Sequence, residues 1–321
     1  MSVIKKKRQP CTILLPLFNG SAFLSRAITN LCEIAGPEDE ILIIDDGSVD
    51  IGDQEFERLL NSDPRMVLHN CEHRGLVDTL NYGIRVASHE LIARVDVDDI
   101  YETDRIQLQV EYLENNPEIS AVFSDYVMVS PSGANLGVFP SAISPELTSF
   151  SLFSSQRTAH PSVMYRKSMV LSVGGYRLDD FPAEDLGLWI RLVKVSKIGS
   201  IPQSLLKYTI HSSSITSTNQ QLMKKKSLAL RKQYGSSGDF TKILASAAKL
   251  LVQYRGSAHR NLRILFFLED LVNFNLLTNG LHRRKILTII TNQIFKRNVF
   301  LIVPVIYVFR MKLKRMKIMS K

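Results

Sequence analysis

Short apolar runs alternate with helical patterns along the first 130 residues of the chain. Apolar runs of strand length occupy residues 12–15, 40–44, 66–68 and 91–95. Between and after them, apolar residues recur at helical spacing, which predicts helices over residues 23–31, 54–61, 76–87 and 104–113. Alternating strands and helices are typical of a mostly parallel sheet flanked by helices. We therefore expect an α/β fold.

The pattern is looser beyond residue 130. Ser130-Pro131-Ser132-Gly133 has the composition of a turn, whereas residues 140–160 are rich in serine and favour neither a helix nor a strand. Residues 184–195 are helical in pattern and largely apolar, which predicts a buried helix. Trp189 lies within this helix and is expected to belong to the core rather than to a sugar-stacking platform.

Charge divides the chain into two parts. A change in composition at residues 212–219 predicts a boundary, with one domain over residues 1–218 and a basic helical region over residues 219–321. Residues 221–321 hold 21 Lys and Arg against three acids, whereas residues 1–220 hold 19 Lys and Arg against 28 acids. We therefore expect the two parts to face different partners.

Cysteine content and hydropathy bear on the compartment. Cys11, Cys32 and Cys71 are too few and too scattered for a disulfide framework or a zinc site, which fits a reducing environment. The first residues are basic and lack the apolar stretch of a secretory signal. No apolar run reaches the roughly 18 residues of a transmembrane helix, and the nearest candidate is 298–309. A cytoplasmic location is expected.

Three carboxylates in four residues, Asp96, Asp98 and Asp99, follow the apolar run at 91–95. Such close carboxylates repel one another unless a cation lies between them. Hard divalent cations prefer oxygen ligands, and Mg²⁺ is commonly held by one or two carboxylates together with substrate phosphates. The loop is therefore a candidate metal site, with an acidic loop that caps the next helix as the alternative.

A second acidic turn, Asp45-Asp46-Gly47-Ser48, ends the strand at 40–44. Ligands of a parallel sheet bind beyond the carboxyl ends of its strands, so this turn and the acidic triplet are expected to line one crevice. A buried Asp there accepts a hydrogen bond from a ring N–H such as uracil or thymine offers. The alternative is an ordinary turn with an Asp helix cap.

Further short motifs stand in the order and spacing of one family. They are Pro16-Leu17-Phe18-Asn19-Gly20, Asp45-Asp46-Gly47-Ser48, Gly75-Leu76, Leu80-Asn81-Tyr82-Gly83-Ile84, Asp96-Val97-Asp98-Asp99, Ala159-His160-Pro161-Ser162, Gly174-Gly175-Tyr176, Glu184-Asp185-Leu186 and Lys207-Tyr208-Thr209-Ile210-His211. The chain resembles the family-two inverting glycosyltransferases of the GT-A fold over about residues 10–218. Each motif alone is weakly specific, but the ordered set is strongly so.

The resemblance implies a nucleotide-sugar site at the carboxyl edge of the sheet. Pro16, Phe18 and Asn19 would wall the nucleotide pocket, and Asp46 would bind the edge of the base. Gly75 would belong to the same nucleotide-sugar site. A UDP-sugar is the expected donor.

The resemblance also implies Mn²⁺ or Mg²⁺ as the cofactor. Asp99 would hold the ion that bridges the donor diphosphate, Asp98 would contact the ribose, and Asp96 would support the loop. His211 would lie near the metal or the diphosphate, although a lone histidine also suits a structural role. The arginine that the family carries at the position of Thr209 is missing, which weakens the match there.

Asp185 is the candidate catalytic base. Inversion requires a carboxylate that takes the proton of an acceptor hydroxyl on the face opposite the leaving group. Glu184 and His160 are expected on the acceptor side. The alternative for Glu184-Asp185 is that two acids at a helix N-terminus interact favourably with the helix dipole, which stabilises a helix by about 0.3–1 kcal/mol.

Three interpretations compete for the basic region. In the first, the clusters at 224–226, 282–285 and 312–317 contact an anionic membrane surface, and residues 286–290 and 300–309 dip into the interface. In the second, the region binds nucleic acid, but no nucleic-acid-binding motif is present, so that this partner is not expected. The third is a helical bundle with solvated basic faces.

Taken together, the sequence predicts a metal-dependent inverting glycosyltransferase. It would move a hexose or N-acetylhexosamine from a nucleotide-diphosphate sugar to a hydroxyl of a lipid-linked glycan in bacterial surface polysaccharide synthesis. The enzyme would be peripheral on the inner face of the cell membrane. The alternatives are a non-catalytic nucleotide-sugar- or polysaccharide-binding relative and a polyprenyl-phosphate sugar transferase.

Overall fold

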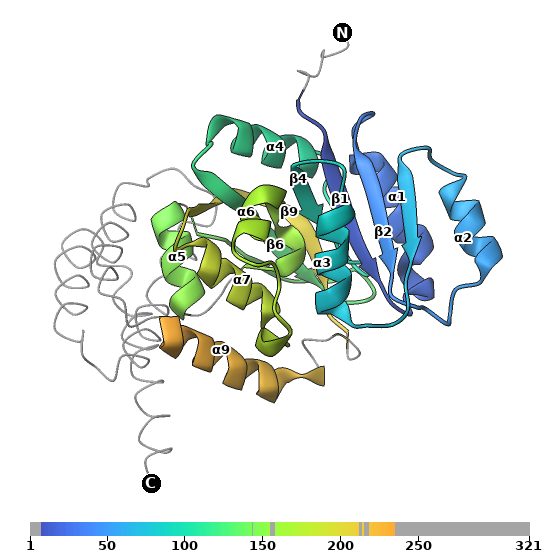
Figure 1. Cartoon of the computed structure of the whole chain (residues 1–321). Helices are drawn as coiled ribbons and strands as arrows, with labels where there is room; N and C mark the ends of the chain where they lie inside the picture. The colour runs from blue at the N-terminus through green and yellow to red at the C-terminus, as the bar shows by residue number, and fades with distance from the viewer. Residues whose placement is uncertain (1–7, 143, 155–157, 212–213, 215–217, 235–321) are drawn as a thin grey trace, which may run out of the picture.

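A computed structural model describes residues 8–142, 144–154, 158–211, 214 and 218–234 (Figure 1). The strands are β1 (Cys11–Leu17), β2 (Glu40–Asp45), β3 (Met66–Asn70), β4 (Leu91–Arg94), β5 (Ile100–Tyr101), β6 (Ile119–Val129), β7 (Asn135–Phe139), β8 (Met164–Arg166) and β9 (Lys197–Thr209). The α-helices are α1 (Ser21–Ile34), α2 (Asp53–Leu60), α3 (Leu76–Val86), α4 (Arg105–Asn115), α5 (Pro145–Ser154), α6 (Lys167–Ser172), α7 (Glu184–Leu192) and α9 (Gln220–Tyr234), and the short 3₁₀ helices are His160–Ser162 and Leu178–Asp180. All of these strands belong to one sheet.

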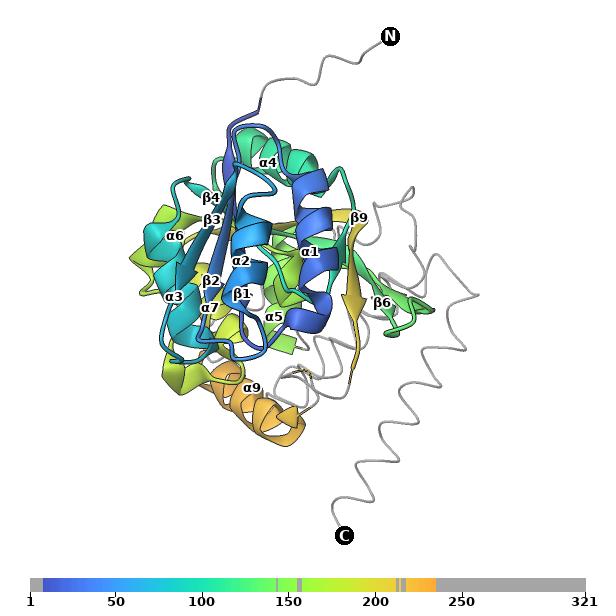
Figure 2. The ribbon, with the colours of Figure 1, turned by 90° about the vertical axis from the view of Figure 1, so that its right-hand side faces the viewer.

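The four strands predicted from apolar runs form the parallel half of the sheet, in the order β3-β2-β1-β4. Alternate residues of these strands point to opposite faces, and both faces are buried, which explains the continuous apolar runs. Ile13 and Ile41 pack on the face covered by α1, α2 and α4, whereas Leu14 and Leu42 pack on the face covered by α3, α5, α6 and α7. Figure 2 shows the sheet between these two layers. The predicted helices between the strands are confirmed.

The other half of the sheet is mixed. β9 runs parallel to β6, while β8 pairs antiparallel with both β4 and β6, β7 with β6, and β5 with β9. The α/β fold class is confirmed, with four parallel and four antiparallel strand pairings rather than a large parallel majority. The turn predicted at residues 130–133 joins β6 to β7, with Gly133 in the left-handed region at φ 83°.

Two segments beyond residue 130 add detail to the sequence prediction. The serine-rich stretch that had no assignment contains α5, whose serine hydroxyls bond back to helix carbonyls, as Ser154 Oγ does to Phe150 O at 3.0 Å. The buried helix predicted over 184–195 ends earlier, at Leu192. Trp189 is fully buried and meets the edge of Phe123, so its place in the core is confirmed.

Helix α9 packs against the second half of the sheet domain. Ser227 and Leu230 are buried, Lys226 Nζ donates to the Asp179 carbonyl at 2.6 Å, and Arg231 Nε donates to the Leu152 carbonyl at 3.1 Å. No helix within the described residues is long and apolar enough to cross a membrane. The segments at 282–290 and 300–317 lie outside the described residues, and the predicted boundary between 218 and 219 stays a prediction.

Candidate active site

The loops that follow β1, β2 and β4 meet at one edge of the sheet because these strands are parallel neighbours (Figure 1). The Asn19 amide donates to Ser48 Oγ at 2.8 Å, and Asn19 Oδ1 accepts from the Val49 amide at 3.0 Å. Gly20 lies against Val97, where an added Cβ would stand 3.1 Å from a valine methyl. The crevice predicted from the sequence therefore has its three loops in contact.

The acidic triplet forms a compact group. Oxygens of Asp96, Asp98 and Asp99 lie within 4.8 Å of one another. Asp99 is only 1% exposed; its Oδ1 accepts the Thr209 amide at 2.8 Å, and its Oδ2 has no hydrogen-bond partner among the described residues. Burial, reinforced by the charges of Asp96 and Asp98, raises the pKa of Asp99 well above its usual range. A buried oxygen without a partner is costly, so this donor set fits a divalent cation.

Two buried arginines lie behind the loop. Arg94 Nη1 donates to Asp96 Oδ2 at 2.6 Å, and Arg105 Nη2 donates to the Arg94 carbonyl at 2.9 Å. Burial raises the pKa of Asp96 to about 6 although the Arg94 charge opposes the rise. The Asp96 amide donates to the Tyr101 hydroxyl at 2.6 Å. Asp96 is thus tied into the scaffold, and Arg105 is a supporting residue that sequence reasoning missed.

The end of β9 brings His211 to the acidic loop. His211 Nε2 lies 2.6 Å from Asp98 Oδ2, and both side chains are partly exposed. Thr209 Oγ1 donates to the Asp98 carbonyl at 2.7 Å. A second donor to that carbonyl is Arg26 Nη2 on α1, at 2.7 Å. His211 therefore lies at the acidic loop with Asp98 as its direct neighbour, and its place near a metal or diphosphate stays a prediction.

Asp46 lies on the predicted nucleotide side and is 4% exposed. Its Oδ1 accepts the Arg74 amide at 2.8 Å and its Oδ2 accepts the Gly75 amide at 2.9 Å, so that it fixes the loop in which Gly75 has φ 91°. His73 Nδ1 also lies 2.8 Å from Asp46 Oδ2. The predicted contact between Asp46 and the base stays a prediction, and the loop-fixing bonds are an additional finding.

Two stacked aromatic rings, those of Phe18 and His73, lie on the predicted nucleotide side. Phe18 is 48% exposed and stacks on the His73 ring, with centroids 4.1 Å apart and an interplanar angle of 22°. Pro16 lies within β1, in register with Ile44 of β2. Phe18 therefore offers an open aromatic face, whereas Pro16 is part of the sheet. His73 carries no sequence signal of its own and was missed.

Two adjacent acids begin α7 but have different surroundings. Asp185 is partly exposed, and its Oδ1 accepts the Leu186 amide at 2.6 Å. Glu184 is 5% exposed, and its Oε2 has no hydrogen-bond partner among the described residues. Burial, with a contribution from the Asp185 charge, raises the pKa of Glu184 to about 7. Asp96 adds to this rise, which places the start of α7 near the acidic loop.

A buried ion pair ties the last turn of α7 to the 3₁₀ helix that precedes it. Asp180 Oδ2 accepts from Arg191 Nη1 at 2.7 Å, and Arg191 Nη2 donates to the Gly175 carbonyl at 2.5 Å. An added Cβ at Gly187 would lie 2.1 Å from Asp180 Oδ2, so the ion pair requires glycine at this position. This brace was missed, although a glycine inside an apolar helix is a signal of close approach.

His160 lies beneath the same helix. Its Nε2 is 2.7 Å from the Tyr176 hydroxyl, and burial, helped by the nearby Arg94 charge, lowers the pKa of His160 well below its usual value. Asn81 holds the backbone of Tyr176 through both its amide and its carbonyl, each at 2.9 Å. The assignment of His160 to the acceptor side stays a prediction.

A family model described as glycosyl transferase family 2 matches residues 12–170. An uncharacterized glycosyltransferase of Haemophilus influenzae is 30% identical over 190 residues, which cover 57% of this chain and 68% of that protein. The UDP-Gal:alpha-D-GlcNAc-diphosphoundecaprenol beta-1,3-galactosyltransferase of Escherichia coli is 27% identical over 175 residues, which cover 53% of this chain and 62% of that protein. The amylovoran biosynthesis glycosyltransferase AmsE of Erwinia amylovora is 25% identical over 200 residues, covering 61% and 74%. The chain thus spans less than two thirds of the Escherichia coli protein.

Solved structures share the fold. TarS 1–349 of S. aureus in complex with UDP matches with a TM-score of 0.58 and 14% identity, over 88% of this chain and 87% of that one. The mannosyltransferase PcManGT of Pyrobaculum calidifontis, in complex with GDP-Man and Mn²⁺, matches with a TM-score of 0.57 and 14% identity, over 92% and 89%. At this level of identity the likeness concerns the fold, and the predicted GT-A fold is confirmed.

Proposed function

The chain belongs to glycosyltransferase family 2, and on this premise we propose that it is a metal-dependent inverting hexosyltransferase. It would move a hexose or N-acetylhexosamine from a nucleotide-diphosphate sugar to a hydroxyl of a lipid-linked glycan. The observation that carries the proposal is the presence of two unlike acid groups near one another, since the Asp96 charge acts on Glu184. One is the buried triplet with an unpartnered Asp99 oxygen, and the other is the Glu184-Asp185 pair at the start of α7.

Asp99 is the residue that would hold Mn²⁺ or Mg²⁺, with His211 and the ribose-binding candidate Asp98 beside it. A bound divalent cation neutralises the negative charge that develops on a departing diphosphate. Arg94 pairs with Asp96 and withdraws that carboxylate from the triplet, which supports a positioning role for Asp96. The ion pair also limits the charge repulsion within the loop.

The nucleotide would lie between the loop that follows β1 and the loop that follows β2. Phe18 offers an exposed ring for stacking with the base, and stacking of a base on an aromatic ring contributes about 1–3 kcal/mol. Asp46 fixes the adjoining backbone at Arg74 and Gly75. UDP is the preferred candidate because a structural neighbour holds UDP and the Escherichia coli relative is named for a UDP-sugar.

Asp185 would act as the general base. Its carboxylate takes the proton of the acceptor hydroxyl, whose oxygen bonds to C1 of the sugar as the bond from C1 to the diphosphate oxygen breaks. Attack on the opposite face converts an α-linked donor into a β-linked product. Asp185 is partly exposed and therefore accessible to an acceptor, whereas Glu184, which would stand on the acceptor side, is buried next to it.

The names of two relatives support the proposed acceptor and the proposed role in polysaccharide synthesis. One is named for a diphosphoundecaprenol-linked acceptor and another for amylovoran biosynthesis. We therefore assign this chain to surface polysaccharide synthesis on the inner face of the cell membrane, as a peripheral enzyme. The basic composition of residues 221–321 supports contact with an anionic surface.

A donor screen tests the proposal. Purified protein is incubated with Mn²⁺ or Mg²⁺ and a panel of nucleotide sugars, and release of nucleoside diphosphate is measured with and without a lipid extract. We expect metal-dependent release from one donor that increases with lipid and is lost in Asp99→Ala. Nucleotide binding without turnover of any donor would instead indicate a non-catalytic relative. Transfer that survives in Asp185→Asn would indicate a phosphate acceptor such as polyprenyl phosphate.

A further inference from the structure

All charged side chains of helix α9 are positive. Its sequence includes five basic residues and no acid. Two of the five are used to hold the helix on the domain, since Lys226 bonds to the Asp179 carbonyl and Arg231 to the Leu152 carbonyl. The other three, Lys224, Lys225 and Lys232, are exposed.

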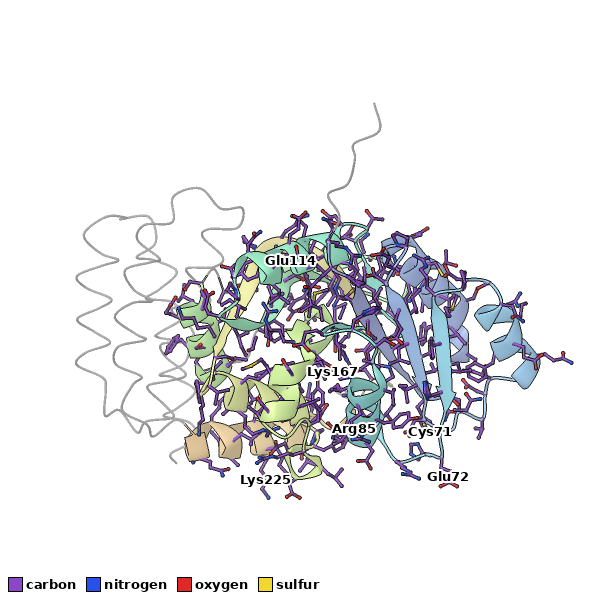
Figure 3. All side chains as sticks on the ribbon, turned by 45° about the horizontal axis from the view of Figure 1, so that its top comes forward. Cys71, Glu72, Arg85, Glu114, Lys167 and Lys225 are labelled. Carbon is purple, nitrogen blue, oxygen red and sulfur yellow. The ribbon has the colours of Figure 1, made fainter. Side chains whose placement is uncertain are left out.

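Leucines lie beside these lysines. Leu222 is 44% exposed and Leu228 is 41% exposed. At 100° per residue, Lys225 and Lys232 lie at the centre of the exposed face, with Leu222 and Leu228 on its two flanks. Figure 3 shows Lys225 on the side of α9 that points away from the domain. This exposed face is therefore basic along its middle and apolar at its margins.

A loop of the domain extends this surface. Leu178 is 68% exposed and is followed by Asp179, whose carbonyl holds Lys226. Because Lys226 bonds to the Asp179 carbonyl, the loop that carries Leu178 lies against α9. The exposed charges of this loop are Arg177 and Asp179, one of each sign. We call Leu178 together with the exposed face of α9 the basal surface.

The basal surface lies next to the candidate active site. Helix α9 begins nine residues after His211, and α9 packs against α7, whose first turn carries Asp185. Asp179, which α9 holds, precedes Asp185 by six residues. In Figure 1, α9 runs along the same lower end of the molecule at which β1 and β2 finish.

We propose that the basal surface binds the anionic headgroups of a lipid bilayer and so turns the active site toward the membrane. This inference builds on the proposed function, because a lipid-linked acceptor would be met at that surface. Each lysine near an anionic bilayer contributes about 1 kcal/mol, and exposed leucines enter the headgroup boundary. A second copy of the same face would be repelled by like charge, and a nucleic acid would leave the leucines without a partner.

Vesicle flotation of the full-length chain tests the proposal. The probe is vesicles of 30% phosphatidylglycerol in phosphatidylcholine, compared with pure phosphatidylcholine, at low salt. We expect Lys224→Gln/Lys225→Gln/Lys232→Gln to lower partitioning onto the anionic vesicles about 100-fold, at about fivefold per lysine. Leu178→Ser/Leu222→Ser/Leu228→Ser is expected to reduce the binding that persists in high salt.

A matched control variant has the same change in net charge elsewhere. Arg58→Gln/Lys194→Gln/Lys197→Gln removes three exposed cations, one on α2, one between α7 and β9, and one at the first residue of β9. The control is expected to float like the wild type. The control and the α9 lysine variant should both keep the wild-type thermal transition. The proposal would be overturned if the control and the α9 lysine variant lost vesicle binding equally. It would also be overturned if the α9 lysine variant kept its binding. Equal flotation of the wild type on neutral vesicles would overturn it as well.

Catalysis is measured separately in the same samples. Release of nucleoside diphosphate with a water-soluble acceptor is expected to be unchanged in the α9 variant, because none of the substituted lysines belongs to the site. Loss of vesicle binding with intact release supports the inference. Intact release with unchanged vesicle binding would reject the inference and leave the proposed function standing. Vesicle binding that depends on α9 in a protein without any turnover would reject the function alone.

Discussion

The two acid groups of the candidate active site contain the same kind of side chain in opposite circumstances. The triplet of Asp96, Asp98 and Asp99 is crowded, and its deepest member is fully enclosed. The pair at the start of α7 has one buried member, Glu184, and one accessible member, Asp185. Crowded carboxylates that Arg94 compensates only in part favour a bound cation, whereas the partly exposed Asp185 is accessible to the proton of an acceptor hydroxyl.

The two acid groups also differ in the contacts that hold them in place. The triplet is held by β9 through Thr209 and by the buried Arg94, both acting on the backbone or on carboxylates of the loop. Helix α7 is held by the Asp180–Arg191 ion pair, which ties its last turn to the 3₁₀ helix that precedes it. We infer that the triplet is built to bind a cation and that the second group is built to transfer a proton.

The largest expected effect is on the proton-transfer side of the comparison. Asp185→Asn preserves shape but removes the base, so kcat for transfer should fall by about 10²–10⁴-fold. The KM for the donor should change little, because Asp185 is not part of the nucleotide side. Steady-state kinetics with the donor identified in the screen measures both constants. A rise in KM with unchanged kcat would move Asp185 out of the chemical step.

The free energy of unfolding should depend on pH through the buried Glu184. The pKa of Glu184 is raised by burial to about 7 from an ordinary 4.5, so the folded state retains a proton that the unfolded state releases. The stabilising contribution is complete below about pH 4.5 and is lost as the pH rises to about 7, a change of about 3 kcal/mol. Urea unfolding of wild type and Glu184→Gln across this range measures it. The difference between the two curves should fall with pH, and a flat difference would contradict the assignment.

The brace behind α7 predicts a smaller cost. Gly187→Ala places a methyl group against Asp180 Oδ2 and should lower the free energy of unfolding by about 1–3 kcal/mol. Because the Asp180–Arg191 pair ties α7 to the 3₁₀ helix before it, a shift of this pair should move α7 and lower kcat while metal binding is retained. The control is Leu188→Met, which nearly conserves side-chain volume at a buried position of the same helix. Normal kcat in a destabilised Gly187→Ala protein would show that the brace does not position Asp185.

The smallest expected effect is on the support of the triplet. Thr209→Val removes the hydroxyl bond to the Asp98 carbonyl but keeps the Thr209 amide that bonds to Asp99. A loss of about 1 kcal/mol corresponds to roughly fivefold weaker binding of Mn²⁺. Isothermal titration with Mn²⁺ in the presence of UDP measures the change. Unaltered affinity would mean that the backbone bond alone orients the loop.

Sequence patterns predicted the parallel half of the fold well because its strands are buried on both faces and appear as unbroken apolar runs. They failed at α5, where buried positions occur all around the helix and serines replace apolar residues, so that no periodic pattern exists. The long pairing of β6 with β9 was also beyond them, since it joins segments almost 80 residues apart.

The candidate site shows the same division. The residue types at the sheet edge were predicted because the loops after parallel strands converge by topology. The bonds of Asp46 to the 74–75 backbone, the Arg105 support and the Asp180–Arg191 brace were not predicted. Each of these depends on a tertiary contact between different elements or loops, and only Gly187, inside an apolar helix, gave a signal of close approach.

The most direct test of the division between the two acid groups is a Mn²⁺ titration followed by electron paramagnetic resonance, in the presence of UDP. It compares the wild type with Asp99→Asn and Asp185→Asn. We predict that Asp185→Asn binds Mn²⁺ as the wild type does, although its transfer activity is lost, and that Asp99→Asn loses Mn²⁺ binding. Equal loss of Mn²⁺ in both variants, or unchanged binding in Asp99→Asn, would contradict the assignment of the cation to the triplet and of the proton to Asp185.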